Sequence, residues 1–480
     1  MKTTSIKLVM TLLIALLLHP MMDQQESGRY FPQTGCTMRG RFLSYWQQHG
    51  GLAQFGLPLT EQFYDNPDSI FKPQGLLVQH FERAVFEYQP ENQPPNDVLL
   101  TLLGSQAYKQ KYPDGAPNQL ASRSNPYYFA ATGKTLGGNF RAYWEGHGGL
   151  AVQGYPLSDE FSEVSSVDGR SYTVQYFERA VFELHPENAG TQYEVLLTPL
   201  GVQRYRSLLM RTRLYSLDAS STGEAWAGGQ RGMVLHHRNG RWVITNNVRT
   251  TETVTDIAIP APDDVWITSG SIYQWQANEW LESKAGFSIY RFDFVTRDVA
   301  WAGSLYASGV LLQYDGDKWY SRDYQMRDLP LDVDGLDRDE VWAVSRYSWY
   351  HYKTSTGAER QFVRDGEFRS ISMITGAEGW IAAGGKNKLY HYDGSTWQPA
   401  ASPVNQPLNS IEMLDSSTGW AVGEAGTILH YDGTSWQQQA SPTTTTLNAV
   451  KMVSANEGWA VGDAGTILHY QNGVWSVYSY

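Results

Sequence analysis

The stretch that decides the fold is Gly419-Trp420-Ala421-Val422-Gly423, followed by Gly426-Thr427-Ile428-Leu429-His430-Tyr431-Asp432-Gly433 and then Trp436. The same pattern returns between residues 451 and 475. Tryptophan recurs in this setting 35 to 41 residues apart, at Trp226, Trp266, Trp301, Trp342, Trp380, Trp420 and Trp459. Short apolar runs between Gly and Asp turns, at a period of about 40 residues, are typical of β-propeller blades, because one four-stranded sheet cannot bury both faces alone. Seven copies predict a seven-bladed β-propeller over residues 214–480.

The last copy predicts the four strands of one blade. From the centre outward they are residues 447–453, 458–462, 466–470 and 475–480. The Asn-Gly pair before the outer strand suits a tight hairpin, because Asn and Gly tolerate positive φ. Paired tryptophans such as Trp459 and Trp475 are expected to pack between neighbouring blades. The ring is expected to close without exchanging a strand between its two ends.

The segment before the propeller is a duplication of another kind. Residues 42–63 return as residues 140–161 at an offset of 98, and residues 79–87 return as residues 175–183. The Phe…Tyr-Trp stretch has helical spacing, Phe-Glu-Arg-Ala-Val-Phe-Glu alternates as a strand does, and Gly-x-Pro-Leu predicts a turn and a capped short helix. The chain is therefore predicted to be mainly β. The propeller is preceded by two tandem small α+β repeat modules.

These patterns divide the chain into predicted segments. They are a signal peptide over 1–22, repeat module 1 over 31–104, a linker over 105–127, repeat module 2 over 128–204 and the propeller over 214–480. The linker is rich in Pro, Asn, Ser and Gly, and residues 205–213 are expected to join module 2 to the propeller.

The first residues predict export from the cytoplasm. Lys2 and Lys7 accompany an apolar run over residues 8–18, which is too short to span a bilayer comfortably. An uncleaved segment would instead be an N-terminal membrane anchor, and this alternative stays open. Cys36 is the single cysteine, which excludes an intrachain disulfide. The expected location is secreted, extracellular or at the cell surface.

Charge and motifs narrow the function classes. A net charge of -12 and a pI near 5.4 argue against a nucleic-acid partner, which would call for a basic surface. No Gly-x-Ser-x-Gly elbow, phosphate loop or His-Glu-x-x-His motif occurs, so no enzyme is predicted. Repeated histidines on separate blades are not expected to converge on a metal, and no cofactor is predicted; they are His391, His430 and His469.

Paired carboxylates in both modules invite a glycosidase interpretation. Each pair lies within five residues beside an arginine, and both modules carry the same set, Glu82, Glu87 and Arg83 in one and Glu178, Glu183 and Arg179 in the other. An enzyme needs one cleft with two carboxyl pKa values pushed apart, whereas a duplicated Glu-Arg pair favours structural salt bridges.

Two resemblances follow from these motifs. The Gly-Trp-Ala-Val-Gly…Gly-Thr-Ile-Leu repeats resemble the propellers of photosystem II assembly and stability factors, and more loosely the Asp-box repeats of sialidases. The family's Asp-Gly-Gly-x-Thr-Trp turn is one residue shorter here, as at residues 393–397 and 432–436. The Gly-Gly-Leu-Ala-x-x-Gly-x-Pro-Leu units resemble secreted repeats of Chloroflexi-type bacteria, and distantly the Leu-Gly-Phe-Pro repeats of actinobacterial envelope proteins. The latter resemblance implies attachment to the cell envelope.

Binding is expected on the rim formed by turns between second and third strands, because loops on a rigid scaffold present function. The candidates are Arg231, Tyr306, Arg346, Tyr347, Trp349, Lys386, Glu424 and Asp463. The sequence thus predicts a non-catalytic binding or scaffold protein, whose propeller binds a protein or glycan of the envelope and whose modules attach to it. A membrane is expected only through an uncleaved N-terminal segment. The alternatives are a photosystem assembly or stability factor and a sialidase-like glycan hydrolase.

Overall fold

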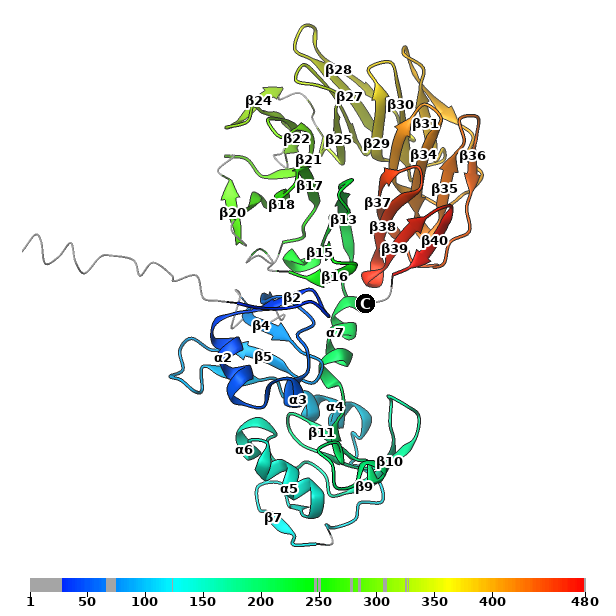
Figure 1. Cartoon of the computed structure of the whole chain (residues 1–480). Helices are drawn as coiled ribbons and strands as arrows, with labels where there is room; N and C mark the ends of the chain where they lie inside the picture. Colours follow the sequence, from blue (N-terminus) through cyan, green and yellow to red (C-terminus); the bar gives the residue numbers. More distant parts are fainter. Residues whose placement is uncertain are drawn as a thin grey trace, which may run out of the picture.

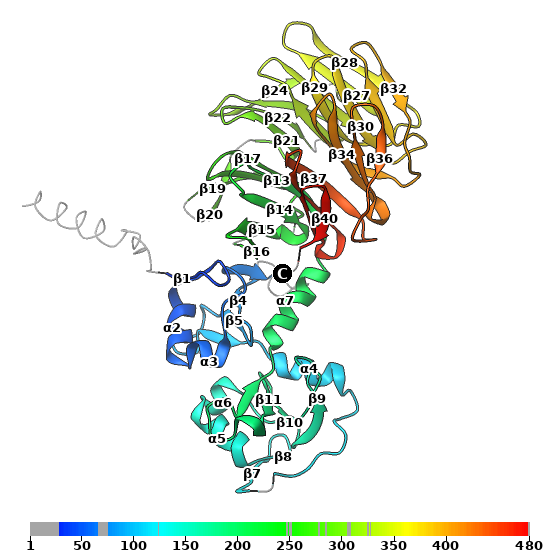
Figure 2. The same ribbon diagram turned by 45° about the vertical axis from the view of Figure 1, so that its right-hand side comes forward.

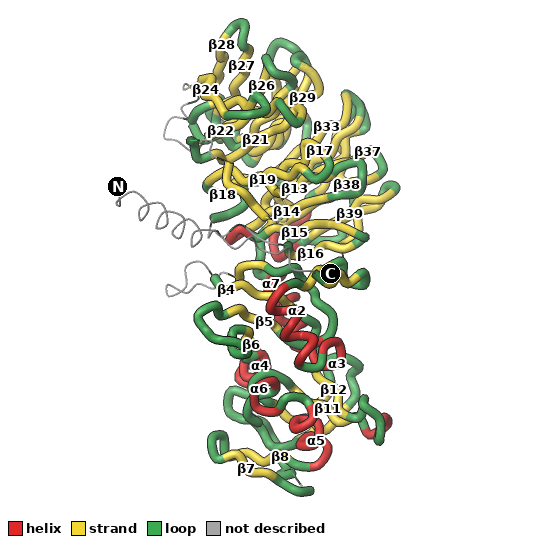
Figure 3. Tube along the Cα trace, turned by 60° about the vertical axis from the view of Figure 1, so that its left-hand side comes forward, coloured by secondary structure: helices red, strands yellow, loops and turns green. Residues whose placement is uncertain are grey.

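The computed structural model describes residues 28–65, 75–122, 124–245, 248, 252–276, 279–283, 286–304, 309–323, 326 and 328–478. The predicted signal peptide over residues 1–22 lies outside this part of the chain. Within the described part, no helix is both long and apolar enough to cross a bilayer. The fold is mainly β, with the helices gathered in the N-terminal half and strands filling the C-terminal half (Figure 3).

From residue 214 onward, the described chain forms four-stranded antiparallel sheets, each built from four consecutive strands (Figures 1 and 2). We number these sheets 1 to 7 and call this region the propeller half. Sheet 1 contains β13 (Leu214–Ala219), β14 (Ala225–Gly229), β15 (Val234–Arg238) and β16 (Arg241–Ile244). Sheet 2 contains β17 (Asp256–Ala261), β18 (Asp264–Ser269), β19 (Ser271–Gln276) and β20 (Glu279–Ser283). Sheet 3 contains β21 (Ile289–Thr296), β22 (Val299–Ser304), β23 (Leu311–Tyr314) and β24 (Trp319–Asp323).

The remaining sheets follow the same order. Sheet 4 contains β25 (Asp332–Gly335), β26 (Glu340–Ser345), β27 (Ser348–Lys353) and β28 (Gly357–Phe362). Sheet 5 contains β29 (Phe368–Thr375), β30 (Glu378–Ala383), β31 (Leu389–Tyr392) and β32 (Trp397–Ala400). Sheet 6 contains β33 (Leu408–Asp415), β34 (Thr418–Gly423), β35 (Ile428–Tyr431) and β36 (Trp436–Gln438). Sheet 7 contains β37 (Leu447–Ser454), β38 (Glu457–Gly462), β39 (Ile467–Gln471) and β40 (Val474–Val477). Turns η2 (Gln230–Gly232), η3 (Glu424–Gly426) and η4 (Asp463–Gly465) join second to third strands in sheets 1, 6 and 7.

Tryptophans pack between neighbouring sheets, as the repeat predicts. Trp420 of sheet 6 is fully buried, and its ring centroid lies 5.5 Å from that of Tyr470 in sheet 7. Trp459 of sheet 7 lies 5.3 Å from Trp242 of sheet 1, at an interplanar angle of 85°. The innermost strands β37 and β13 are also neighbours. Sheets 7 and 1 therefore meet through packing, and each sheet is completed by its own four strands.

The recurring histidines pack against the tryptophans of their own sheets. His430 lies opposite Trp420 in the strand register, with ring centroids 4.6 Å apart. His469 stacks on Trp459 at 4.0 Å. The described residues contain no group of three or more His, Cys, Asp or Glu side chains arranged to hold a metal ion. The histidines therefore serve as cross-strand packing partners.

The duplicated N-terminal segments share one order of elements. Module 1 contains the hairpin β1 (Arg29–Phe31) and β2 (Cys36–Met38), helices α2 (Gly40–Gln48) and α3 (Gly51–Phe55), and a sheet of β3 (Phe63–Asp65), β4 (Leu76–His80), β5 (Val85–Tyr88) and β6 (Val98–Leu100), followed by α4 (Leu103–Lys111). Module 2 contains β7 (Tyr127–Phe129), β8 (Lys134–Leu136), α5 (Gly138–Gly146), α6 (Gly149–Val152), β9 (Phe161–Val164), β10 (Ser171–Tyr176), β11 (Val181–Leu184), η1 (Pro186–Asn188) and β12 (Val195–Leu197), followed by α7 (Leu200–Met210).

Several local predictions within the modules are wrong. The Gly-x-Pro-Leu segment forms no helix; α3 precedes it instead. Its turn is held by the Glu82 carboxylate, which accepts a hydrogen bond from the Leu57 N–H at 3.1 Å. Residues 82–84 bend between β4 and β5 rather than continuing a strand. The expected linker begins inside α4, and residues 205–210 belong to α7.

The two modules exchange their last helices. Helix α4 follows module 1 but packs on module 2, where a Cβ on Gly104 would lie 1.9 Å from the Phe177 carbonyl oxygen. Helix α7 follows module 2 but packs on module 1, where a Cβ on Gly201 would lie 1.9 Å from the Phe81 carbonyl oxygen. The two glycines that end the sequence repeats thus allow these close backbone approaches.

Module 1 and helix α7 also contact the propeller half. The Glu61 N–H donates to the Ile244 carbonyl oxygen at 2.9 Å, and the Glu61 carboxylate pairs with Arg238. Just after α7, the Thr212 carbonyl oxygen accepts the Gly465 N–H at 2.7 Å. Buried residues of both modules and of sheets 1 and 7 form one continuous apolar cluster. The two halves of the chain therefore share part of their core.

Candidate functional site

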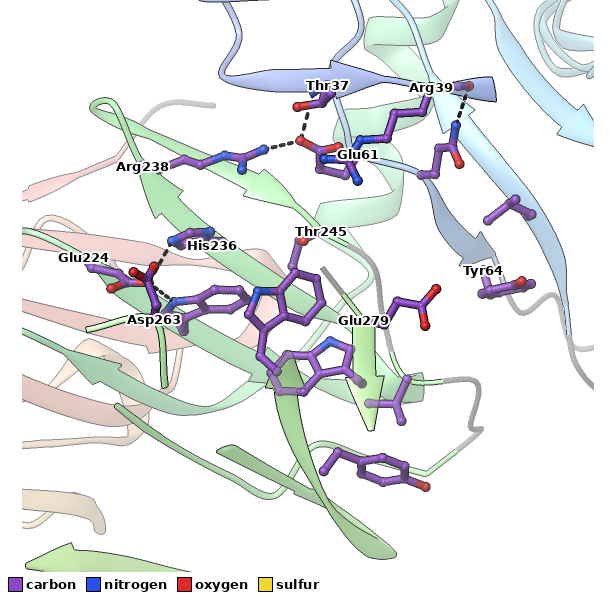
Figure 4. Close-up of a pocket in the computed structure, with 17 residues that line it drawn as sticks. Thr37, Arg39, Glu61, Tyr64, Glu224, His236, Arg238, Thr245, Asp263 and Glu279 are labelled. Carbon is purple, nitrogen blue, oxygen red and sulfur yellow. Dashed lines mark hydrogen bonds and ion pairs between the residues drawn. The ribbon is translucent and has the colours of Figure 1, made fainter. Parts of the chain in front are cut away.

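A cavity lies where module 1 meets sheets 1 and 2, and Figure 4 shows its lining side chains. Its volume is about 730 Å³, within the ~300–1,000 Å³ range of small-molecule sites. Module 1 and the propeller half both line it, through Thr37, Arg39, Glu61, Gln62, Tyr64, Leu77, Glu224, Trp226, His236, Arg238, Thr245, Val248, Asp263, Tyr273, Trp275, Glu279 and Trp280. We call it the junction pocket.

Three indole rings form the apolar wall of the junction pocket. Trp275 on β19 and Trp280 on β20 are directly opposite in the strand register, with centroids 5.0 Å apart. Both pack against Trp226 of sheet 1, at 5.7 and 5.9 Å. Trp226 is only 1% exposed, whereas Trp275 and Trp280 are half-buried and present part of their surface to the cavity. The corresponding third-strand position in sheets 5, 6 and 7 is a tyrosine, so the double tryptophan distinguishes sheet 2 from them.

A hydrogen-bonded cluster closes one end of this wall. The Glu224 carboxylate accepts the Trp226 indole N–H at 2.8 Å and lies 3.3 Å from His236 Nε2. His236 stacks on Trp226 with centroids 3.9 Å apart. The hydrogen bond with His236 lowers the pKa of Glu224, while burial lowers the pKa of His236. At neutral pH this end therefore carries a carboxylate beside a neutral imidazole.

The module side of the pocket is fixed by Glu61. Its carboxylate accepts the Thr37 N–H at 2.9 Å and pairs with Arg238 across the junction. Three exposed charged groups are left without a side-chain hydrogen bond or ion pair among the described residues: the Arg39 guanidinium and the Asp263 and Glu279 carboxylates. The pocket can therefore offer donors from one side and acceptors from the other.

Thr245 adds a neutral polar group to the pocket. The residue is 5% exposed and lines the cavity. Its backbone N–H donates to the Val234 carbonyl oxygen at 3.1 Å, which fixes the residue at the end of β16. Because a hydroxyl both donates and accepts hydrogen bonds, Thr245 suits a ligand that does the same.

The sequence-predicted binding residues lie elsewhere, on turns between second and third strands. Arg231, Glu424 and Asp463 belong to η2, η3 and η4. Arg346 and Tyr347 connect β26 to β27, and Lys386 lies between β30 and β31; Tyr306 is outside the described residues. None of these residues lines the junction pocket.

These turn residues are distributed over several sheets. Arg346 lies over the Tyr347 ring at 5.2 Å, so the structure brings these two together. Glu424 pairs with Arg369 at 3.2 Å, and Asp463 accepts a hydrogen bond from Asn448 at 2.9 Å. Trp349 is 5% exposed and packs beside Trp342 in the core between sheets 4 and 5, so its ring is not presented on the rim.

A second cavity of about 330 Å³ is lined by the innermost strands of all seven numbered sheets. Its carboxylates hold neighbouring sheets together: Asp218, Asp293 and Asp332 accept the N–H groups of Ile259, Gly335 and Ile371 at 2.7, 2.8 and 2.9 Å. Lys451 pairs with Glu412 at 3.0 Å. Arg291 and Arg369 also line this cavity, at different register positions. This polar lining therefore serves the assembly of the sheets.

The duplicated glutamates of the modules are structural. Glu82 and Glu178 each accept a backbone N–H at 3.1 Å, and Arg179 lies 3.7 Å from Glu178. Glu183 accepts the Thr198 hydroxyl at 2.6 Å. Because each carboxylate is engaged within its own module, these pairs do not face a common cleft.

Sequence reasoning missed the junction pocket. One signal was present, since Trp275 and Trp280 give sheet 2 an extra tryptophan. The contribution of module 1 had no local signal, because it depends on a contact between residues far apart in the sequence, such as Glu61 and Arg238.

Comparisons with known proteins do not assign the chain to a family. No protein-family model matches it. A stretch of 54 residues is 39% identical to the immune protein Tsi7 of Pseudomonas aeruginosa, covering 11% of this chain and 18% of that protein. The chain thus matches less than a fifth of that relative's length.

Solved structures similar to this chain include two of YCF48. YCF48 bound to D1 peptide is 14% identical, with 55% of this chain and 92% of that chain covered and a TM-score of 0.46. YCF48 from Cyanidioschyzon merolae is 15% identical, with 55% and 96% covered and a TM-score of 0.45. The computationally designed Ika8 protein is 13% identical, with 56% and 86% covered and a TM-score of 0.42. These likenesses concern the fold alone, and the repeat resemblances of the modules stay predictions.

Proposed function

We propose that this chain is a non-catalytic binding protein, secreted or held at the cell surface, whose junction pocket binds a segment of an envelope glycan. The observation that carries the proposal is the pair Trp275 and Trp280, half-buried on the wall of a cavity of about 730 Å³ with a polar margin. In this proposal the seven numbered sheets are the blades of one closed propeller, which fixes the aromatic wall.

A glycan suits this pocket better than a protein surface does. The C–H faces of a sugar ring carry partial positive charge and stack on the electron-rich faces of indole rings. Sugar hydroxyls donate to carboxylates such as Glu279 and accept from donors such as Arg39 and the Thr245 hydroxyl. The cavity has the size of a small-molecule site, whereas a protein partner would call for a more extended surface.

The modules supply the proposed attachment to the envelope. In module 1 the Tyr30 hydroxyl is engaged by Asn239 of the propeller half. The equivalent residue of module 2, Tyr128, is 63% exposed, and its neighbour Tyr127 is 52% exposed. Figure 1 shows β7, which carries both, at the end of the molecule away from the propeller half. Attachment is therefore assigned to module 2.

Titration calorimetry against oligosaccharides released from purified envelope tests the binding proposal. Trp275→Ala and Trp280→Ala are expected to abolish or greatly weaken binding, while Tyr347→Ala on the turn after β26 leaves it unchanged. Loss of binding only in the Tyr347 variant would place the site on the turns instead. Circular dichroism and thermal melting of each variant check that the sheets remain folded.

Attachment needs a separate test in the full-length chain, because the two halves share a core. Because pocket binding also contributes to retention on purified envelope, attachment is read in the Trp275→Ala background. There, adding Tyr128→Ser should lower retention below that of Trp275→Ala alone. Equal retention of the double variant and Trp275→Ala would show that the module 2 hairpin is not the anchor.

A further inference from the structure

We propose that the junction pocket selects neutral or amine-bearing sugars and disfavours carboxylated ones; this inference rests on the proposed glycan-binding function. It concerns the charge of the ligand, which the aromatic wall alone does not decide.

One opposite-charge pair is internal to the pocket. Glu61 and Arg238 pair across the junction, so their charges offset each other. Glu224 lies beside His236, but burial lowers the pKa of that imidazole and so disfavours a compensating positive charge next to Glu224. The pocket therefore begins with an uncompensated carboxylate at the Trp226 end.

Three further charges remain. Asp263 and Glu279, both from sheet 2, are exposed carboxylates without a side-chain hydrogen bond or ion pair in the described chain, and Arg39 is an exposed guanidinium without one. Figure 4 shows Glu224 and Asp263 at one end of the pocket, Glu279 at the other, and Arg39 on the module side. Among the described lining residues, carboxylates thus lie at separate positions along the pocket, and Arg39 is the one cation left unpaired.

This arrangement gives a charge preference with a physical cause. A ligand carboxylate lying along the pocket meets like charge at these positions, and within the described lining compensation comes from the Arg39 side. Like charges brought together in a partly desolvated site are strongly unfavourable, whereas a protonated amine gains a charge-assisted hydrogen bond. Sugar hydroxyls remain compatible with every group in the set, including the Thr245 hydroxyl.

A matched series of tetrasaccharides tests the proposal in the full-length protein. The probes are β-1,4-linked tetramers of glucose, N-acetylglucosamine, glucosamine and glucuronic acid, which share one backbone and differ in charge. Calorimetry at pH 6 and low salt is expected to show that the glucuronic acid tetramer binds at least about tenfold more weakly than the glucose tetramer. The glucosamine tetramer should bind at least as tightly as the glucose tetramer.

The double variant Asp263→Asn with Glu279→Gln supplies the decisive comparison. It should bind the glucuronic acid tetramer more tightly than the unaltered protein does, with little change for the glucose tetramer. Glu359→Gln, on exposed strand β28 away from the pocket, is the matched charge control and should change neither. The discrimination should also shrink as salt is raised, because salt screens exposed charges.

The outcomes separate the two proposals. Equal or tighter binding of the glucuronic acid tetramer overturns the charge preference and leaves glycan binding intact. Absence of binding by all four tetramers, and by a glycan array of varied linkages, overturns both. Unchanged selectivity in the double variant, with folding preserved, shows that Asp263 and Glu279 are not its source.

Discussion

The two halves of this chain are both built from repeats, yet they hold those repeats together differently. The modules come as a pair and exchange their terminal helices, so that Gly104 approaches module 2 and Gly201 approaches module 1. The sheets of the propeller half exchange no strand, and each presents a tryptophan to the next, ending with Trp459 of sheet 7 against Trp242 of sheet 1.

The difference follows from the number of repeats and the area each can bury. Two small modules bury little surface on their own, and exchanged helices give them a common core. A ring of sheets supplies every sheet with two neighbours, so local packing is enough. We therefore expect a substitution at the exchanged helices to destabilise both modules together. A substitution between two sheets of the propeller half is expected to destabilise that interface first.

The largest effect is expected at the exchanged helices. Gly201→Ala places a methyl group against the Phe81 carbonyl oxygen and should cost at least ~3 kcal/mol, the upper end of overpacking penalties. Gly104→Ala should do the same through module 2. The matched control is Gly146→Ala near the end of α5, which meets no atom within 4 Å and should be neutral or slightly stabilising. Urea denaturation followed by tryptophan fluorescence measures all three, and a Gly201 variant as stable as the Gly146 variant would refute the exchange.

In the ring, Trp420→Ala is expected to cost roughly 3–5 kcal/mol, because it removes a fully buried ring from the contact between sheets 6 and 7. His430→Ala should cost less, because that side chain is half-buried and packs on Trp420 from one side. Hydrogen exchange should show loss of protection first in β34 and β37. A uniform loss of hydrogen-exchange protection across both halves of the chain would contradict destabilisation that begins at the contact between sheets 6 and 7.

A smaller expected effect is the pH dependence of stability that comes from Asp256 on the innermost strand β17. Burial raises the pKa of Asp256 to about 7, although Arg291 lies 3.7 Å away. The unfolded chain releases this proton near pH ~3.9, so between that pH and about 7 the folded state holds a proton that the unfolded state lacks. Asp256 therefore contributes stability that is present at low pH and lost as pH rises through 7.

Asp256→Asn should remove this dependence while keeping an oxygen to accept the Phe292 N–H. The free energy of unfolding of the variant, relative to that of the unaltered protein, is expected to rise between pH 5 and pH 8. A difference that stays constant over this range would show that Asp256 has no raised pKa. Comparing the two proteins at each pH cancels the contributions of other titrating groups.

The smallest expected change in stability is at Tyr30 of module 1, compared with the equivalent Tyr128 of module 2. Tyr30→Phe removes the hydroxyl that Asn239 contacts and should cost ~0.5–1.5 kcal/mol. Tyr128→Phe should leave stability unchanged, because that side chain is 63% exposed. Thermal melting of the two variants checks this, and equal losses would contradict the different use of the two hairpins.

The sheets could be predicted from the sequence because each four-stranded sheet is encoded by one local stretch of the chain. Residues 447–453 and 458–462 were expected as strands, and the structure has Leu447–Ser454 and Glu457–Gly462. The packing of Trp420 and Trp459 between sheets also follows from the spacing of the repeats. The modules were harder, because the role of Gly104 and Gly201 depends on carbonyl groups of the opposite module.

The site was not predictable for a similar reason. The variable turns between second and third strands were the predicted binding site, but Trp349, one of the candidate residues, is buried. The junction pocket depends on module 1 meeting sheets 1 and 2 through Glu61 and Arg238, which are 177 residues apart. Only the unusual pair Trp275 and Trp280 marked sheet 2 in the sequence.

The most direct test of the central claim is hydrogen exchange of the full-length protein with and without the glucose tetramer. Binding is expected to protect backbone amides in β2, β15, β19 and β20, which line the junction pocket, and to leave the turn at Arg346 and Tyr347 unchanged. Protection at that turn, with none in β19 or β20, would contradict the account.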